Sequence, residues 1–418
     1  MSSRKKICIL AFSPIARDGR VLRQIEYLAP HYDLTVVGYG APHPDWAHYP
    51  HVQWVRLPER TATREAGVPP QEQPWARLGV RGIQLLARST FGATLYLGQI
   101  HPRFFDWGYA FRWQLIRELR QALSIRHDAY HANDWDTVSL AANAAKRHGT
   151  KLVIDLHEYA PLQFNHQKNW SLYQTMITYL LRRYAPQAAA ISTVAPLLAD
   201  KYQAELGFQP IVVMNAPAQT AVDFSELDPD HIRLVHHGVS SPVRKPEVMI
   251  EAIAQCDARY TLHLMLLPSD YLTQLQALAE RTAPGRVFFH EPVPPDQIVP
   301  RIAEFDVGFC YIPPTTYNYL YSLPNKFLES IAAGLAVCIG PSPSMEAVVH
   351  QYNLGCIAPS FEAADLAATL NQTTADQWRA MRAAARAAAN ELNAAHEMQK
   401  VVAIYQRLFT ESVRGQEA

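Results

Sequence analysis

The chain has 418 residues and carries 38 Lys and Arg against 38 Asp and Glu, so its formal net charge is zero. A balanced charge gives no global attraction to nucleic acid, which is therefore not an expected partner. The length exceeds what one hydrophobic core usually serves and predicts two domains. Its longest apolar runs fall short of the ~18 residues of a membrane span, and the run after the basic N-terminus is too short for a secretory signal.

Short apolar runs alternate with helical patterns along the whole chain, and this alternation predicts parallel βαβ units. In the first half we expect strands at Lys6–Phe12, Asp33–Tyr39, Val52–Leu57, Ala129–Ala132, Lys151–Leu156, Ala188–Ser192 and Ile211–Met214. Helices are expected there at 18–30, 77–88, 107–124, 136–148, 169–185 and 195–206. In the second half, strands are expected at Ile232–His236, Thr261–Leu267, Val287–His290, Val307–Tyr311, Ala336–Ile339 and Gly355–Ile357, and a helical end at 376–409.

The predicted fold class is α/β, with two Rossmann-like doubly wound domains. Residues 1–215 form the first domain, 231–392 the second, and 393–418 a C-terminal helix. A linker is expected at 216–230, where proline and acidic residues replace the strand pattern. The five cysteines are dispersed with no Cys-x-x-Cys, which predicts reduced thiols in the cytoplasm and no zinc site.

Polar residues follow the predicted strands of the first domain. Gly19 and Arg20 open a helix whose amides could meet an anion, although Arg20 could also pair with Glu26 or be solvated. His131 ends a strand and would point into a crevice, and Asp134 is either a functional group or a helix cap.

His157 and Glu158 end the next strand, where such a pair can do acid–base work. The alternative is ordinary hydrogen bonding within a loop.

Residues 75–127 combine many arginines with dense aromatic side chains, and 58–76 read as an exposed loop. Arg77, Arg81 and Arg88 share one helical face. Such a surface suits an anionic membrane or a lipid-diphosphate acceptor. The alternative is a domain layer with solvated arginines.

The second domain opens with a glycine loop at Gly238 followed by the adjacent cations Arg244 and Lys245. The most informative stretch is 321–349, which predicts helix, turn, strand, loop and helix. Lys326 and Glu329 stand three residues apart at a helix start, so they share a face. A helix N-terminus at the carboxyl end of a parallel sheet favours anions, so Lys326 could meet phosphate and Glu329 sugar hydroxyls. The alternative is a βα unit with surface charges.

The segment from Pro324 to Val337 resembles the donor-binding segment of family 4 glycosyltransferases of the GT-B fold, with its Pro-x-Lys-x-x-Glu and Ala-x-Gly elements. The resemblance implies two domains that face a cleft and a last helix that crosses back to the first domain. It implies that Glu329 binds the nucleotide ribose. The family's second glutamate, eight positions earlier, is Tyr321 here, and its arginine after the loop glycine is Val239.

The resemblance further implies a metal-independent, retaining glycosyltransferase of hexosyltransferase type, as in polysaccharide biosynthesis. Its co-substrate would be a nucleotide-diphosphate sugar, with no cofactor, and its acceptor a glycan or lipid-linked molecule at the inner face of a membrane. The residues expected to serve are His131, His157 and Glu158 in catalysis; Gly238, Arg244, Lys245, Asn325, Lys326, Glu329 and Glu346 in donor binding; and Gly19, Arg20 and Asp134 toward the acceptor or cleft.

Two other classes stay open at this stage. A nucleotide-sugar epimerase shares the fold, and strict dependence of sugar transfer on an added acceptor would exclude it. A non-catalytic subunit of the same fold is the second, and failure of every nucleotide sugar to bind would favour it.

Overall fold

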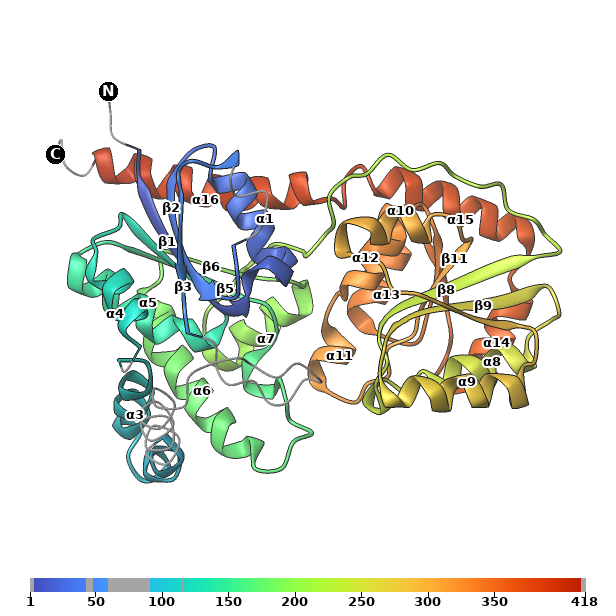
Figure 1. The fold of residues 1–418 in the computed structure, drawn as a ribbon, viewed down its shortest axis with the longest axis horizontal. Helices are drawn as coiled ribbons and strands as arrows, with labels where there is room; N and C mark the ends of the chain where they lie inside the picture. Colours follow the sequence, from blue (N-terminus) through green and yellow to red (C-terminus); the bar gives the residue numbers. More distant parts are fainter. Residues whose placement is uncertain (1–3, 43–47, 59–90, 115, 415–418) are drawn as a thin grey trace, which may run out of the picture. The chain divides into compact units, whose positions relative to one another are not determined.

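The computed structural model describes residues 4–42, 48–58, 91–114 and 116–414 (Figure 1). The chain forms two compact units. Unit 1 comprises Met1–Thr193, Ala199–Ile211 and Val401–Ala418, and unit 2 comprises Val194–Leu198 and Val212–Lys400.

Unit 1 is built on a seven-stranded sheet of order β3-β2-β1-β4-β5-β6-β7. Its strands are β1 (Lys6–Pro14), β2 (Asp33–Tyr39), β3 (Val52–Arg56), β4 (Ala129–Asn133), β5 (Lys151–Leu156), β6 (Ala190–Thr193) and β7 (Ile211–Val212). Its helices include α1 (Gly19–Leu28), α3 (Arg103–Gln114), α4 (Arg117–Ser124), α5 (Trp135–His148), α6 (Trp170–Tyr184) and α7 (Pro196–Leu206). The strand order reverses between β1 and β4, which is the point where such sheets bind ligands.

Unit 2 holds a six-stranded sheet of order β10-β9-β8-β11-β12-β13 (Figure 1). Its strands are β8 (Ile232–Val239), β9 (Tyr260–Leu267), β10 (Val287–His290), β11 (Val307–Cys310), β12 (Ala336–Ile339) and β13 (Gly355–Ile357). Its helices are α8 (Glu247–Gln255), α9 (Asp270–Thr282), α10 (Ile298–Ile302), α11 (Tyr317–Tyr321), α12 (Asn325–Ala332), α13 (Pro343–Tyr352), α14 (Ala363–Gln372) and α15 (Ala375–Ala388). The order reverses between β8 and β11, and the predicted pair of doubly wound α/β domains is confirmed.

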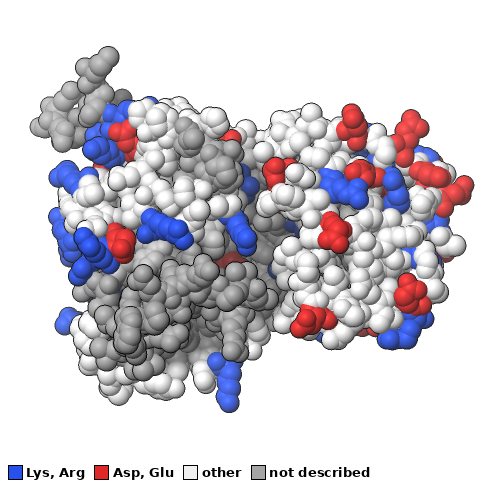
Figure 2. All heavy atoms as spheres, in the orientation of Figure 1, with Lys and Arg blue, Asp and Glu red and all other residues white. Residues whose placement is uncertain are grey.

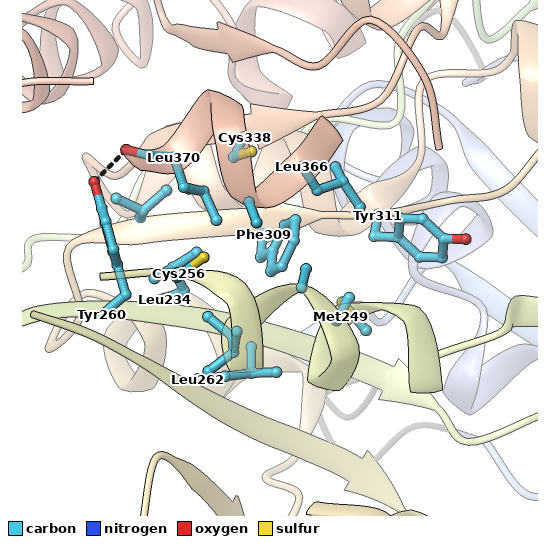
Figure 3. Close-up of a cluster of buried hydrophobic side chains, with 14 of the residues drawn as sticks. Leu234, Met249, Cys256, Tyr260, Leu262, Phe309, Tyr311, Cys338, Leu366 and Leu370 are labelled. Carbon is cyan, nitrogen blue, oxygen red and sulfur yellow. Dashed lines mark hydrogen bonds between the residues drawn. The ribbon is translucent and has the colours of Figure 1, made fainter. Parts of the chain in front are cut away.

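The core of unit 2 explains why β11 and β12 are unbroken apolar runs. Every residue of β11 and β12 is buried, as expected for parallel strands covered on both faces. Figure 3 shows side chains of β8, β9 and β11 meeting those of α8 and α14. The hydroxyl of Tyr260 donates to the carbonyl of Leu370 at 2.5 Å, so this buried polar group is satisfied.

All thirteen predicted strands are present, and two helical predictions need correction. The helix expected at 107–124 is two helices, since α3 ends at Gln114 and α4 begins at Arg117. The helical end expected at 376–409 is also two helices, α15 and α16 (Ala394–Arg414). Asn393 separates them because its side-chain oxygen accepts the backbone N–H of His396 at 3.0 Å and so caps α16.

The expected linker, 216–230, contains neither helix nor strand and belongs to unit 2. The part of α16 that begins at Val401 belongs to unit 1, where the ring of Tyr405 lies 5.7 Å from that of Tyr32. All five cysteines are free thiols. Within the described residues, no helix has the length and hydropathy needed to cross a membrane.

Candidate functional site

The start of α12 and the end of β8 bring the predicted donor residues of unit 2 together. Pro324 takes the N-cap position of α12 with extended backbone. α12 packs on β8 and β11, the two strands at the reversal of the sheet. This packing buries Lys326 beneath the strand ends, although lysine side chains are usually exposed.

Gly238 lies between two cations. A β-carbon added to Gly238 would stand 3.5 Å from Lys326 Nζ and 3.8 Å from Arg244 Nη1. The backbone of Gly238 has φ = 128°, which a residue with a side chain rarely adopts. Because Gly238 has no side chain, an amine and a guanidinium both lie close to its backbone, and such a pair suits a diphosphate.

Lys326 is held by a histidine. Its Nζ lies 2.9 Å from Nε2 of His236, and Nδ1 of His236 lies 2.8 Å from the carbonyl oxygen of Phe309. A carbonyl only accepts, so Nδ1 carries the proton and Nε2 accepts from the amine. Burial, with the Arg244 charge second, lowers the pKa of Lys326 to about 7. Burial and the neighbouring Lys326 hold the pKa of His236 well below its usual value.

Glu329 lies one turn further along α12, half-buried beside His237. Its Oε2 is 3.4 Å from His237 Nε2. Burial and the Lys326 charge lower the pKa of His237 to about 3, so at neutral pH the carboxylate faces a neutral imidazole and not a cation.

The other predicted donor residues occupy varied positions. Lys245 is exposed in the left-handed region, with φ = 44°. Asn325 is exposed and accepts a hydrogen bond from the Asn215 amide at 2.7 Å. Glu346 lies in the first turn of α13. Tyr321 ends α11 with its ring 4.5 Å from that of Tyr317.

In unit 1 the predicted cleft residue Arg20 is fully buried, which corrects the expectations of a solvated group or a partner at Glu26. Its Nε and Nη2 each lie 2.6 Å from an oxygen of Asp155. Gln24 and Ser192 also donate to this carboxylate, at 2.7 and 2.6 Å. Burial alone would raise the pKa of Asp155, but the bound Arg20 holds it well below its usual range.

His157 joins the same cluster and has two carboxylates around it. Its Nδ1 lies 3.2 Å from Asp134 and its Nε2 lies 3.3 Å from Asp155. Burial would lower its pKa, yet Asp134 and Asp155 together raise it well above the usual value. The raised pKa favours the imidazolium form of His157, in which both ring nitrogens can donate to the flanking carboxylates. Glu158 uses its backbone carbonyl to accept from the Tyr202 hydroxyl at 2.6 Å.

Asp134 does not cap α5 through its side chain, although it occupies the N-cap position with φ = 60°. It accepts the backbone N–H of His157 at 3.1 Å, so it ties two strand ends together. His131 does not point into a crevice. It is 1% exposed, and its Nδ1 lies 2.9 Å from the Tyr405 hydroxyl of α16. Burial lowers the pKa of His131 to about 4.

Gly19 begins α1, but the anion that meets this helix start is the protein's own carboxylate. Asp18 is the N-cap, and its Oδ1 accepts the backbone N–H of Val21 at 3.2 Å. Arg77, Arg81 and Arg88 of the predicted basic stripe lie outside the described residues, as does most of the loop predicted at 58–76.

Sequence reasoning assigned no role to four polar residues of these clusters, namely His236, His237, Gln24 and Asn133. The two histidines stand directly before Gly238, the glycine of the predicted loop. Their position at a strand end next to the sheet reversal was the available signal. Gln24 had none, because its partners Asn133 and Asp155 are more than 100 residues away.

Comparisons with known proteins agree with this architecture. Residues 20–221 match the model of Glycosyltransferase Family 4. The structure of Anabaena HepE in complex with UDP and glucose is similar at 16% identity and a TM-score of 0.63, covering 97% of this chain and 100% of that one. Sucrose-phosphate synthase of Thermosynechococcus elongatus is similar at 13% identity and a TM-score of 0.68, covering 98% and 100%.

A glycosyltransferase of Rickettsia africae is similar at 10% identity and a TM-score of 0.62, covering 97% of this chain and 99% of that one. No curated protein sequence matches significantly. These structural likenesses concern the fold, and the family model concerns the first half of the chain. Residues 20–221 thus match Glycosyltransferase Family 4, and the chain as a whole has the fold of these solved structures, the two-domain GT-B fold.

Proposed function

We propose that the enzyme transfers a sugar from a nucleotide-diphosphate sugar, which it binds at the start of α12. The observation that carries this proposal is the convergence of Lys326 and Arg244 over Gly238, with Glu329 on the same helix. Cations over open backbone suit a diphosphate, and a half-buried carboxylate one turn away suits vicinal hydroxyls. HepE was solved with UDP and with UDP-glucose, so a uridine nucleotide is the first donor to test.

In this proposal, Lys326 and Arg244 stabilise the departing diphosphate. Negative charge develops on the leaving oxygen as the sugar bond breaks, and fixed positive groups stabilise it in a site with little water. Lys326 is fixed by burial and by His236, and the guanidinium of Arg244 lies 5.6 Å from the centre of the Tyr319 ring. We propose that these cations make a metal ion unnecessary and that the sugar keeps its anomeric configuration.

The donor assignment predicts different effects for two substitutions. Glu329→Gln should weaken binding of both nucleoside and nucleoside diphosphate by about tenfold to a hundredfold, because hydrogen bonds to a charged group contribute about 1.5–3 kcal/mol. Lys326→Met should weaken the diphosphate by a similar factor and leave the nucleoside unchanged. Isothermal titration with UDP, GDP, ADP and their nucleosides measures both effects.

Exposed Glu280 on α9 provides the matched control, since Glu280→Gln should change neither affinity nor melting temperature. If Glu329→Gln binds the nucleotides as wild type does and only melts earlier, Glu329 is a structural partner of His237. The donor-site assignment would then be wrong.

We propose a glycan or lipid-linked acceptor at an anionic membrane surface, in the cytoplasm. Unit 1 carries 26 Lys and Arg against 18 Asp and Glu, whereas unit 2 carries 12 against 20. On the face drawn in Figure 2, Lys and Arg predominate over unit 1, while both signs are spread over unit 2. Unit 1 also exposes apolar side chains on helical residues 91–100 and on α3: Tyr96 (63%), Ile100 (81%) and Trp107 (56%). Basic charge beside exposed apolar groups is typical of peripheral membrane binding.

Replacing Ile100 and Trp107 together with Ser should reduce binding to vesicles of anionic lipid by at least about tenfold, because each buried apolar side chain contributes about 1.5–3 kcal/mol. Vesicle co-sedimentation measures this, with neutral vesicles in parallel. Phe288→Ser changes an exposed aromatic residue of unit 2 and should have no effect. Equal binding of wild type and double variant, or no binding by either, contradicts the membrane proposal.

A further inference from the structure

His236 has no direct role in the donor assignment, yet it is buried between a strand carbonyl and the donor-site lysine. Nδ1 of His236 lies 2.8 Å from the Phe309 carbonyl oxygen, and Nε2 lies 2.9 Å from Lys326 Nζ. The carbonyl belongs to β11, so it is fixed by the sheet. An acceptor fixed in this way restricts the amine of a long, flexible lysine to one position.

That position is beside the side-chain-free backbone of Gly238. The backbone of Gly238 excludes a β-carbon that would contact both Lys326 and Arg244. Without a fixed acceptor, the lysine amine could turn away from this position toward other partners. The titratable groups around the amine come from β8, the turn after it, β11 and α12 itself: His236, His237, Arg244, Cys310 and Glu329.

We propose that His236 is a positioning residue that holds the Lys326 amine over Gly238 to receive the donor diphosphate, and that the amine takes up a proton from solvent as the diphosphate binds. This inference rests on the donor site proposed above. The proton has a physical reason. Lys326 is buried, and the partner of its Nζ at 2.9 Å is a neutral imidazole, not a carboxylate. Burial and the Arg244 charge accordingly lower the pKa of Lys326 to about 7, and two phosphate charges favour the ammonium form.

Proton uptake by Lys326 can be distinguished from protonation changes of the nucleotide itself. The terminal phosphate of a nucleoside diphosphate loses its last proton near pH 6, so at pH 8 it contributes almost none. Titration at pH 8 in two buffers with different ionisation enthalpies should therefore give close to one proton taken up per nucleotide bound. The same titration of Lys326→Met, and of wild type with the nucleoside, should give none.

The role of His236 is tested with three variants and the nucleoside diphosphate that binds wild type most tightly among UDP, GDP and ADP. His236→Phe should weaken that diphosphate by about tenfold or more and leave its nucleoside unchanged, because only the lysine loses its acceptor. His236→Gln keeps an acceptor oxygen and should recover most of the affinity. His263→Phe places the same substitution at a half-buried histidine of β9 and should change neither ligand.

The outcomes are distinct. If wild type binds none of the three diphosphates, the donor site and this inference are both wrong. If wild type binds but His236→Phe keeps the diphosphate-to-nucleoside affinity ratio, His236 has no positioning role and the donor site stands. If His236→Phe weakens nucleoside and diphosphate equally, its effect is structural, which also overturns the inference. If the diphosphate binds at pH 8 without proton uptake, the proposal that Lys326 is protonated on binding is wrong.

Discussion

Arg20→Met should lower the free energy of unfolding of unit 1 by about 3–5 kcal/mol, because it leaves the buried carboxylate of Asp155 without its charge partner. Arg20 and Asp155 are 3% and 1% exposed and form two hydrogen bonds of 2.6 Å. Water cannot replace the guanidinium at such a depth. Urea denaturation measures the loss, and hydrogen exchange of β1 and β5 assigns it to unit 1.

Two further variants separate charge from shape. Arg17→Met, three residues earlier on an exposed side chain, should change stability little. The double variant Arg20→Met with Asp155→Leu should be more stable than Arg20→Met alone, because no unpaired charge remains. A double variant as unstable as the sum of its single variants would mean that packing, not the ion pair, sets the loss.

This charge cluster illustrates what a single sequence can and cannot predict. The strand that carries Asp155 was predicted with its observed bounds, because Leu152–Ile154 is a short β-favouring apolar run that Leu156 continues on alternating positions. The partner was not predictable, because Arg20 lies 135 residues earlier and its neighbours in sequence offered Glu26 instead. Local patterns determine strands and helices. Pairs across a doubly wound sheet depend on which strands become neighbours.

The donor region of unit 2 was more predictable because its residues lie within short segments at strand ends. The i, i+3 spacing placed Lys326 and Glu329 on one face, and the glycine loop indicated Gly238. What the spacing could not reveal is that Lys326 is buried against His236. A hydropathy scale predicts that a lysine is exposed. Lys326 is buried instead, because α12 packs on β8.

The first-domain histidines show the same limit on the chemical side. Their positions at strand ends suggested acid–base groups, but burial and neighbours decide their charge. His131 is neutral because burial lowers its pKa, whereas two carboxylates hold His157 as a cation. Neither state follows from the residue type or its place along the strand.

Acid should unfold unit 2 before unit 1. Burial holds the pKa of His237 and His263 at about 3 and that of His236 well below its usual value. In the unfolded chain each titrates near pH 6.5, so below that pH the unfolded state binds more protons. Stability therefore rises with pH in this window and is lost as pH falls from about 6.5 toward 3, by about 1.4 kcal/mol per pH unit for each histidine.

Unit 1 has two histidines of the same kind and one opposing group. Burial lowers the pKa of His131 to about 4 and also lowers that of His127, so both of them destabilise unit 1 as pH falls below 6.5. The pKa of His157 is raised, so its contribution is fully present below pH 6.5 and is lost only as pH rises through its folded value. His157 offsets none of the loss in unit 2, where buried His236 and His237 and half-buried His263 add up to roughly 4 kcal/mol per pH unit. A fall of two pH units therefore removes an amount of free energy that approaches the whole stability of a typical domain. Hydrogen exchange of β9 and β5 between pH 7 and pH 4.5 compares the two units directly.

His263→Phe isolates one of these terms away from the donor residues. The Nδ1 of His263 lies 2.9 Å from His290 Nε2, and its ring stacks on Phe288, so an aromatic replacement preserves much of the packing. Whatever its effect at pH 7, the slope of unfolding free energy against pH below 6.5 should fall by about 1.4 kcal/mol per pH unit. His350→Phe, at an exposed histidine of α13, should leave the slope unchanged. An unaltered slope in His263→Phe would mean that His263 is protonated in the folded protein at these pH values, and the burial of neutral histidines would not explain the acid sensitivity of unit 2.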